Sequence, residues 1–346
     1  FGSGNMPQID NISSTIESSF GIDPLITSVV MSFLVALVII GGIKRISSIA
    51  ASIVPLMAFI YLIGGLSVLI FNYENIIPSF QIIILDVFEG SSVVGGFLGA
   101  SFSLAFTYGV ARGLYSNEAG QGSAPIAHAT SRTKYSVEEG FVSILEPFLD
   151  TIIICTLTGL VILSSGVWTE KFNNTFEKTS MHVVNGYLDE QRDSKDILNF
   201  LYGENSSLSS FSGDLDIISG EIQNKVTIVN NRSIAEDVTV KKNGIPFTGK
   251  IRINNSQIDA DYEFVGKSLV KSAVLTSKAF NKGFFGNYGE YIVSIGLLLF
   301  AFSTVITWSY YGDRCSAYLF GDSSVIYFRI FYILAFFIAG SGYIDT

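Results

Sequence analysis

The sequence predicts an all-α polytopic membrane protein that carries a small β-rich insert on one side of the membrane. Hydrophobic residues make up 49% of the 346 residues and charged residues only 15%, whereas an ordinary soluble domain has about 25% charged residues. Several apolar segments reach the roughly 20 residues with which a helix crosses about 30 Å of hydrocarbon. The basic residues outside one long polar block also fall on a single side of the membrane when these segments are alternated across it.

Six apolar segments are long enough to span the bilayer. The first ends in Gly-Gly and is followed at once by Lys44 and Arg45, the second contains Pro55, where we expect a kink, and Arg112 closes the third. The apolar stretch 76–88 is too short to span comfortably, which leaves an interfacial helix, a re-entrant piece and an extension of the next helix as open alternatives. The predicted spans are 24–43, 48–71, 93–111, 137–164, 291–311 and 324–339.

The charge distribution predicts the orientation of these spans. Cytoplasmic loops of membrane proteins are enriched in Lys and Arg, so the face that gathers the basic residues is predicted to be cytoplasmic. The polar block 166–288, which holds 14 of the 21 Lys and Arg, is then predicted to be extracytoplasmic. The basic residues of the cytoplasmic face are Lys44, Arg45, Arg112, Arg132, Lys134, Arg314 and Arg329.

The polar block shows the alternation of β-strands. It contains VTIVN and DVTVKKNGIPFTGKIRIN, in which Asn243-Gly244 is the dipeptide favoured in two-residue hairpin turns. The first half of the block, which contains the Ser- and Asn-rich stretch NSSLSSFSG, is predicted to be a loose linker. We therefore divide the chain into a membrane core over 1–165, a partly β insert over 166–288 and a second part of the membrane core over 289–346.

Cysteine and histidine are too sparse to indicate redox or metal chemistry. Cys155 and Cys315 lie in or beside apolar segments, which favours two buried thiols over a disulfide framework or a metal site. His128 is interpreted as a polar residue at a helix end, and His182 offers no partner for metal ligation. We expect neither an enzyme nor a bound cofactor, and no nucleic-acid partner.

The segment RGLYSNEAGQGSAPIAHA, residues 112–129, combines small residues with Asn117 and Glu118. A membrane helix precedes it instead of a β-strand, so it does not match a phosphate-binding loop. Small residues let membrane helices pack closely, while a carboxylate there is expected to pair or to face water, and Arg112 and Arg132 are candidate partners. We interpret the segment as a cytoplasmic gate with Asn117 and Glu118 as polar latches.

Glu146 and Asp150 form a second polar pair at membrane depth. They are four residues apart on one span, with Pro147 between them, and so share a helix face. They are candidate coupling-ion ligands, a proton-sensitive switch, or members of a network with Arg112 or Arg132, and we slightly favour the network. An intramembrane enzyme built on this pair is disfavoured because no nucleophile or metal set accompanies it.

Five motifs in a fixed order give the sequence a specific resemblance. The chain resembles the sodium:alanine symporters, the alanine or glycine:cation symporter family, although the block 166–288 is much longer than the loop which that family has there. The matching motifs are GNMPQ at 4–8, GGIKRI at 41–46, VPLMAFIY at 54–61, RGLYSNEAGQGSAPIAHA at 112–129 and FAFSTVITWSYYGDRCSAYLFG at 300–321.

The resemblance implies a LeuT-like fold of two inverted five-helix repeats with discontinuous helices near the bilayer midplane. Family members begin earlier, with a broken first helix, so we expect this chain to be a fragment that runs from about the third core helix to the ninth. Gly95 and Gly96 fit the break in the sixth core helix, where free backbone groups meet substrate or ion. Close helix packing explains these glycines equally well.

The resemblance also implies the residues of the site. Thr304 and Trp308, one helical turn apart, would line an amino-acid pocket, with Gln8 opposite. Ser303 and Thr304 would supply hydroxyl oxygens to Na⁺, because hard cations prefer oxygen ligands. The alternative is that these hydroxyls bond only to carbonyls of their own helix. The remaining substrate-binding candidates are Gly95, Gly96 and Phe97.

From this resemblance we expect a secondary active transporter of the plasma membrane. It would couple the entry of Na⁺ to the uptake of a small neutral amino acid, alanine or glycine, by alternating access. The alternative is a receptor-like or channel-like membrane protein whose extracytoplasmic insert binds the ligand.

Overall fold

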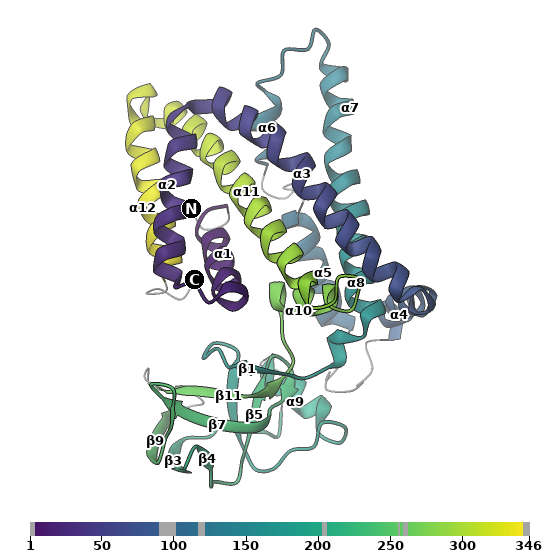
Figure 1. Cartoon of the computed structure of the whole chain (residues 1–346), viewed down its shortest axis with the longest axis vertical. Coiled ribbons are helices and arrows are strands. Elements are labelled where there is room, and N and C mark those ends of the chain that lie inside the picture. Colours follow the sequence, from purple (N-terminus) through teal and green to yellow (C-terminus); the bar gives the residue numbers. More distant parts are fainter. Residues whose placement is uncertain are drawn as a thin grey trace. The chain divides into compact units, whose positions relative to one another are not determined.

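The computed structural model describes residues 4–89, 102–116, 122–202, 206–254, 257–258 and 262–341. These residues form two compact units. The helical unit combines Phe1–Ile76, Val110–Ser165 and Thr276–Thr346, and the β unit combines Ile77–Gly109 with Gly166–Leu275. Figure 1 shows the elements of each unit.

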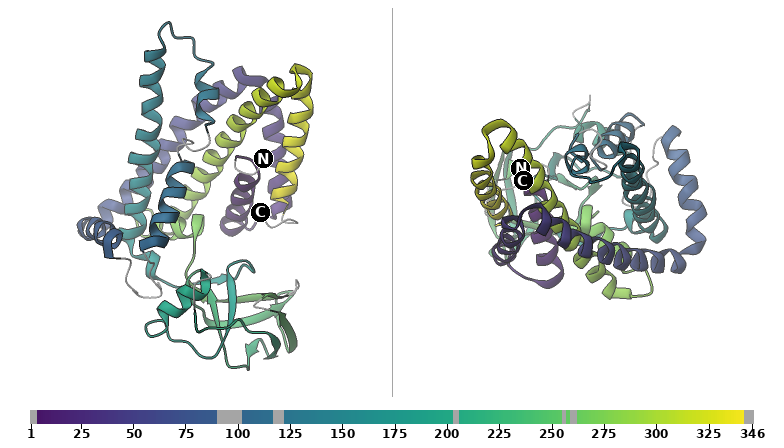
Figure 2. Two further views of the ribbon diagram at one scale, coloured as in Figure 1. Left: turned by 180° about the vertical axis from the view of Figure 1, so that it is seen from behind. Right: turned by 90° about the horizontal axis from the view of Figure 1, so that it is seen from above.

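The helical unit is built around five helices that share one apolar core. The core is made of side chains such as Ile9, Val35, Ile46, Val305 and Phe336, all buried. Figures 1 and 2 show α12 running alongside α2, with α1 next to both. The five helices are α1 (Met6–Phe20), α2 (Pro24–Ile40), α3 (Gly42–Phe71), α11 (Gly289–Phe320) and α12 (Val325–Gly340).

Local sequence explains where the first helices begin and turn. The Asp23 carboxylate accepts a hydrogen bond from the backbone N–H of Leu25 at 2.7 Å, and Pro24 begins α2, so the predicted start of this span coincides with a capped helix end. The helix ends at Ile40 because Gly42, with φ +66°, turns the chain into α3. Contrary to the predicted start at residue 48, α3 begins at this turn and continues through Pro55.

Among the residues that the structure describes, four helices are long and apolar enough to cross a membrane, and α2, with 17 residues, is a shorter apolar helix. These spans agree in place with five of the predicted ones, but the helix that contains α11 extends well beyond the predicted 291–311. The predicted third span is described only from Phe102, where α5 (Phe102–Ser116) begins and then passes the predicted end at residue 111. The four long spans are Gly42–Phe71, Ser136–Ser165, Gly286–Phe320 and Asp322–Gly340.

The span Ser136–Ser165 changes helix type at its proline. α7 (Ser136–Pro147) is followed by a π-helical stretch, Phe148–Cys155, and by α8 (Thr156–Ser165). Proline has no N–H and crowds the carbonyl of the preceding turn, so a wider turn relieves the clash. Asp150 therefore lies in the widened part of the helix.

The shorter helical elements include one that sequence reasoning left open. The apolar stretch beginning at residue 76 forms α4 (Ile76–Glu89), a 14-residue helix that follows a 3-10 turn, Tyr73–Asn75. The remaining helices are α6 (Ala124–His128), α9 (Ser194–Leu201) and α10 (Ser272–Phe280), and the remaining 3-10 turns are Val167–Thr169, Gly286–Tyr288 and Asp322–Ser324.

The β unit contains three antiparallel sheets. Their inward side chains form one core that includes Val183, Leu215, Val240, Ile253 and Phe264. The sheets have the strand orders β1-β11-β7-β8, β10-β9-β3-β4 and β2-β5-β6. The strands are β1 (Phe172–Thr175), β2 (Met181–Asn185), β3 (Gly213–Ile218), β4 (Glu221–Ile222), β5 (Val226–Asn230), β6 (Ser233–Ile234), β7 (Glu236–Lys242), β8 (Ile245–Pro246), β9 (Gly249–Asn254), β10 (Gln257–Ile258) and β11 (Glu263–Ser268).

The hairpin predicted from Asn243-Gly244 is present. Lys242 pairs with Ile245, and the two turn residues have φ values of +51° and +76°, the left-handed conformation that this turn type requires. VTIVN forms β5, as its alternation predicts. The strands end at Ser268, and α10 follows, so the β structure occupies less of the block than 166–288.

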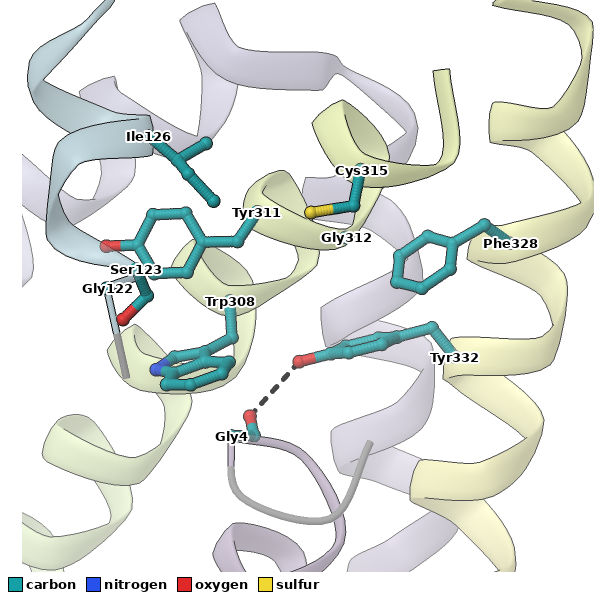
Figure 3. A pocket seen from close by; sticks show the side chains of 10 residues that line it. All are labelled: Gly4, Gly122, Ser123, Ile126, Trp308, Tyr311, Gly312, Cys315, Phe328 and Tyr332. Atoms are coloured by element: carbon teal, nitrogen blue, oxygen red, sulfur yellow. Dashed lines mark hydrogen bonds between the residues drawn. The ribbon is translucent and has the colours of Figure 1, made fainter. Parts of the chain in front are cut away.

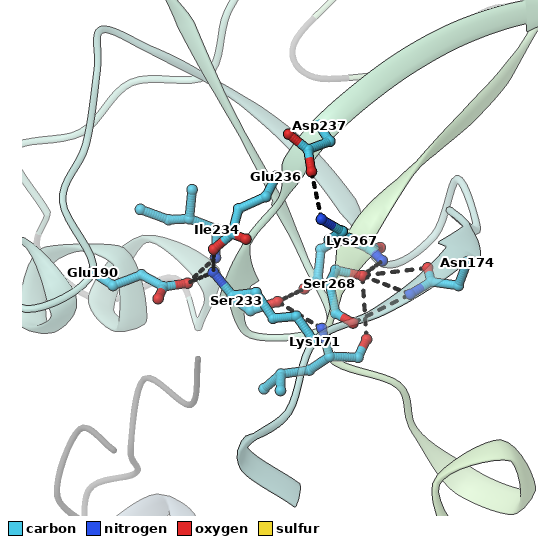
Figure 4. A network of polar contacts seen from close by, with 11 residues as sticks. Lys171, Asn174, Glu190, Ser233, Ile234, Glu236, Asp237, Lys267 and Ser268 are labelled. Atoms are coloured by element: carbon cyan, nitrogen blue, oxygen red, sulfur yellow. Dashed lines mark hydrogen bonds and ion pairs between the residues drawn. The ribbon is translucent and has the colours of Figure 1, made fainter. Parts of the chain in front are cut away.

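A polar network of the β unit connects the loop residues Lys171 and Glu190 with the strands β7 and β11 (Figure 4). The Lys171 ammonium lies 2.6 Å from a carboxylate oxygen of Glu190 and 2.6 Å from one of Glu236, and its side chain is only 10% exposed. Nearby, the hydrogen bond from Lys267 to Asp237, at 2.7 Å, raises the pKa of the Lys267 amine. Each cation of this network faces at least one carboxylate, so we interpret the network as a structural feature of the unit.

Candidate functional site

The face of α11 that carries Trp308 lines a cavity of about 280 Å³ in the helical unit (Figure 3). Trp308, Tyr311, Gly312 and Cys315 follow one another at helical spacing and so share this face. The rings of Trp308 and Tyr311 meet edge to face, with centroids 5.5 Å apart. A cavity of this size with aromatic walls fits a small organic molecule.

Gly4 brings the start of α1 directly against Trp308. A Cβ atom built on Gly4 would lie 2.2 Å from Cγ and Cδ2 of the indole ring. Only glycine leaves room for this contact, so the backbone of the first turn itself forms part of the cavity wall.

Tyr332 of α12 holds this turn in place from the other side. Its hydroxyl bonds to the carbonyl oxygens of Gly4 at 3.1 Å and Val305 at 2.9 Å. In return, the side-chain amide of Asn5 donates to the carbonyl oxygen of Tyr332 at 2.9 Å. Tyr332 is 2% exposed, and hydrogen bonds to buried partners fix geometry because no water competes for them. The cavity wall is therefore a rigid junction of α1, α11 and α12.

The second wall comes from the end of the segment 112–129. Gly122, Ser123 and Ile126 line the cavity, and Ser123 is buried. Figure 3 shows Ile126 and Tyr311 on the same side of the cavity. Asn117 and Glu118, the predicted latches, lie outside the described residues, as do Gly95, Gly96 and Phe97.

An ion pair stands beside the cavity between α11 and α12. Arg329 contacts the Asp313 carboxylate through two nitrogens, with the shortest distance 2.7 Å, and Asp313 is 1% exposed. Each partner has a cavity-lining neighbour, because Gly312 precedes Asp313 and Phe328 precedes Arg329. A Cβ atom on Gly312 would come within 1.9 Å of the Phe328 ring, so the two helices touch at this point.

Ser303 and Thr304 lie on α11 before the cavity. Both hydroxyls donate to the carbonyl oxygen of Phe300, at 2.8 and 3.0 Å, which is the local bonding named above as the alternative. Each oxygen keeps its lone pairs when it donates its proton, so this bonding leaves ion ligation open. Thr304 is one turn from Trp308 on the same face but does not line the cavity.

The other predicted residues are spread over the helical unit. Gln8 lies in the first turn of α1, half-buried and next to the turn that forms the wall, but it is not a lining residue. Glu146 is exposed on α7, and Asp150 is half-buried in the π-helical stretch. The described residues contain no group of three or more His, Cys, Asp or Glu side chains able to hold a metal ion.

Two sequence interpretations need correction. The Nδ1 atom of His128 lies 2.6 Å from a carboxylate oxygen of Glu139, so His128 is a partnered residue between α6 and α7 instead of a polar group that simply faces headgroups or water. Neither Cys155 nor Cys315 forms a disulfide, and both are exposed, not buried. Cys315 lines the cavity, and the apolar residues around Cys155 belong to a membrane span, where an apolar face also points to lipid.

A family model described as the sodium:alanine symporter family matches residues 1–190 and 258–345. The chain belongs to this family. It is 32% identical over 337 residues to the sodium/alanine symporter AgcS of Methanococcus maripaludis, which covers 97% of this chain and 52% of the relative. It is 30% identical over 334 residues to an uncharacterized transporter of Haemophilus influenzae, with 96% and 52% covered.

A third relative is covered less completely. The sodium/proton-dependent alanine carrier protein of Bacillus sp. is 33% identical over 177 residues, which are 51% of this chain and 38% of the relative. The chain spans about half the length of the first two curated relatives, 52% of each.

As a member of the sodium:alanine symporter family, the chain is a multi-pass membrane protein of a transporter family, as the sequence predicts. The family model leaves 191–257 unmatched, and this interval holds α9 and most strands of the β unit. Sequence reasoning missed Tyr332 and the pairing of Asp313 with Arg329. The available signal was Arg329, a basic residue inside a predicted span, together with Asp313, which follows the end of another. A charge inside a membrane span usually has a partner.

Proposed function

We propose that this protein is a secondary active transporter that couples Na⁺ entry to the uptake of a small neutral amino acid, alanine or glycine. The observation that carries the proposal is the cavity at Trp308. Three of the motifs that resemble the sodium:alanine symporters contribute to its wall: GNMPQ through Gly4, the segment 112–129 through Gly122, Ser123 and Ile126, and the α11 motif through Trp308.

The size and chemistry of the cavity support a small substrate. Aromatic rings form part of its wall, and its volume of about 280 Å³ is sufficient for a single amino acid. Backbone groups at the start of α1 and the Ser123 hydroxyl offer polar contacts for an ammonium or a carboxylate. Gln8 and Thr304 lie one helical turn or less from this wall and complete the proposed substrate site, together with Gly95, Gly96 and Phe97.

Na⁺ is proposed to bind near Ser303 and Thr304. Their hydroxyl oxygens point lone pairs away from the helix carbonyl that they bond, and oxygen ligands suit a hard cation without burying a full negative charge. One Na⁺ crossing 100 mV releases about 2.3 kcal/mol, which sustains roughly a fiftyfold substrate gradient. The gate is proposed to be the segment with Asn117 and Glu118, with Glu146 and Asp150 coupling it to the ion.

The membrane arrangement completes the proposal. The core would follow the LeuT-like inverted-repeat fold, with 1–165 and 289–346 in the plasma membrane and 166–288 extracytoplasmic. The exposed apolar faces of the spans and the clustering of basic residues outside the insert support this topology.

The test is uptake of labelled alanine into vesicles that contain the full-length protein, with and without an inward Na⁺ gradient. Trp308→Ala and Thr304→Val are expected to lower Na⁺-driven uptake at least about tenfold, the effect of losing roughly 1.4 kcal/mol of binding. Trp168→Ala is the matched control, because this second tryptophan belongs to the 3-10 turn Val167–Thr169. Equal uptake with and without the Na⁺ gradient would contradict the proposal. Unchanged Na⁺-driven uptake in Trp308→Ala would contradict it as well.

A deletion of 191–257 separates the transporter from the receptor-like alternative. If this family-unmatched interval binds the ligand, its removal abolishes the response to alanine. A transporter whose site lies at Trp308 keeps Na⁺-driven uptake after the deletion.

A further inference from the structure

A second hollow of the helical unit lies away from Trp308. It is an apolar groove of about 420 Å³ between α2, α3 and α11, and its walls include Leu34, Ile49, Ile53 and Phe302. Leu34 on its rim is 41% exposed. Of its lining residues, Arg45 is the charged one, so the groove combines apolar walls with a cation.

Arg45 is held at the groove by the end of α2. Its Nη1 atom donates to the carbonyl oxygen of Leu37 at 2.9 Å, one of the last carbonyls of the helix, which have no partner within it. Gly41 makes this possible, since a Cβ there would lie 2.3 Å from Cδ of Arg45. The side chain therefore folds back over the turn, and its charge suits the negative end of the helix dipole.

Most of the hydrogen-bonding capacity of Arg45 remains available. A guanidinium has five N–H groups, and the bond to Leu37 uses one of them. Within the described part of the chain, no carboxylate forms an ion pair with Arg45. Lys44 adds a second exposed cation beside it. A planar group with free donors at the end of an apolar groove matches a phosphate attached to a hydrocarbon chain.

We propose that this groove binds one anionic phospholipid. An acyl chain lies between α2, α3 and α11 against Leu34, Ile53 and Phe302, and the phosphate accepts hydrogen bonds from Arg45, with Lys44 near the headgroup. The site needs the cytoplasmic placement of Lys44 and Arg45, where the leaflet carries anionic lipids, but it does not depend on which substrate the protein transports.

The test measures lipid retention by the full-length protein purified in detergent. The protein is mixed with dioleoylphosphatidylglycerol or dioleoylphosphatidylcholine, and bound lipid is counted by native mass spectrometry. Arg45→Gln is expected to weaken phosphatidylglycerol binding about fivefold, the effect of losing one cation near a lipid surface. Phosphatidylcholine has the same phosphate but also a choline cation, so its binding is expected to be weaker from the start and to change less. Arg314→Gln is the matched control, because Arg314 is also exposed but stacks on Tyr310 at 5.3 Å.

A second variant tests the groove itself. Leu34→Trp fills the hollow from its exposed rim and leaves Arg45 in place, so it is expected to reduce phosphatidylglycerol binding at least as much as Arg45→Gln. If Leu34→Trp binds the lipid like the unmodified protein, the acyl chain does not occupy the groove and the proposal fails. Equal losses from Arg45→Gln and Arg314→Gln would also overturn it, because they would indicate attraction to the basic surface as a whole.

Discussion

The carboxylate of Asp313 on α11 and the guanidinium of Arg329 on α12 form an ion pair whose shortest N–O distance is 2.7 Å. Asp313 is 1% exposed, and the Arg329 side chain is 18% exposed. Since the neighbours Gly312 and Phe328 both line the cavity, the pair fixes the two helices where they form its wall. Burying a charge pair costs hydration energy, so we interpret this pair as fixing geometry more than adding stability.

Removing one partner of this pair should destabilise the protein strongly. Asp313→Asn or Arg329→Gln leaves an uncompensated buried charge, for which we expect a loss of about 3–5 kcal/mol. The measurement is denaturant unfolding of the full-length protein. The double variant Asp313→Leu/Arg329→Met should lose less than either single variant, because no charge is then left alone.

The control for this prediction is an exposed pair. Lys250 and Asp216 lie 3.3 Å apart with 68% and 49% of their side chains exposed, so Lys250→Gln should change stability by less than about 1 kcal/mol. A double variant that is less stable than both single variants would contradict the prediction.

The Tyr332 hydroxyl supports the turn at Gly4. Tyr332→Phe keeps the ring but removes the hydroxyl contacts with the Gly4 and Val305 carbonyls. The Val305 carbonyl keeps its bond within α11, but the buried Gly4 carbonyl loses this donor, at a cost of about 1–3 kcal/mol. Thermal unfolding of the full-length protein measures the loss. Tyr318→Phe is the matched change at a residue that is 89% exposed, and it should be neutral. An unchanged unfolding temperature in Tyr332→Phe would show that the hydroxyl is not needed to support the turn at Gly4.

The sequence predicts the membrane helices well because the length and apolar composition of a single segment are enough to indicate a membrane span. It says less about α1, whose 15 residues mix polar and apolar side chains and whose burial depends on α2, α11 and α12. Helix ends are predicted less well than helix centres: α11 continues beyond Tyr311 to Phe320, past Asp313, which is buried against Arg329 of α12. In the insert, the hairpin at Asn243-Gly244 was predictable since the turn residues lie next to each other.

The candidate site also has features that the sequence predicts and features that it does not. A motif predicts that Trp308 and Thr304 share a helix face, because the spacing is local. The contact of Gly4 with Trp308 and the pair Asp313–Arg329 join residues on different helices, and no local pattern encodes such partners. His128 was interpreted from its own neighbours, whereas its partner Glu139 lies on the next helix.

Gly4→Ala tests the close approach of α1 to Trp308. The added methyl group would lie 2.2 Å from the indole ring, and overpacking of this kind costs about 1–3 kcal/mol. Because the proposed function places substrate at this wall, we expect Na⁺-driven alanine uptake to fall about tenfold. Gly159→Ala is the control, since nothing lies within 4 Å of a Cβ at that helical position. Equal uptake by both variants would exclude the Gly4 contact as a determinant.

His182 should make the stability of the β unit depend on pH. It lies in β2, pairs with Val229 of β5, and its ring meets Phe200 edge-on with centroids 6.0 Å apart. Burial lowers the pKa of His182, because the charged imidazolium loses hydration. The unfolded chain, with a pKa of about 6.5, then binds a proton at a higher pH than the folded unit does.

The sign follows from this difference. Above about pH 7 both states are neutral, so the contribution of His182 is complete. As the pH falls through about 6.5 the unfolded state is protonated first, and stability declines until the pH passes the lower pKa of the folded state. Hydrogen exchange of the β2 and β5 amides in the full-length protein, corrected for intrinsic rates, should therefore show less protection at about pH 5.5 than at about pH 7.5. His182→Gln should lose less protection over this interval, and an equal loss in the variant would assign the pH dependence to other groups.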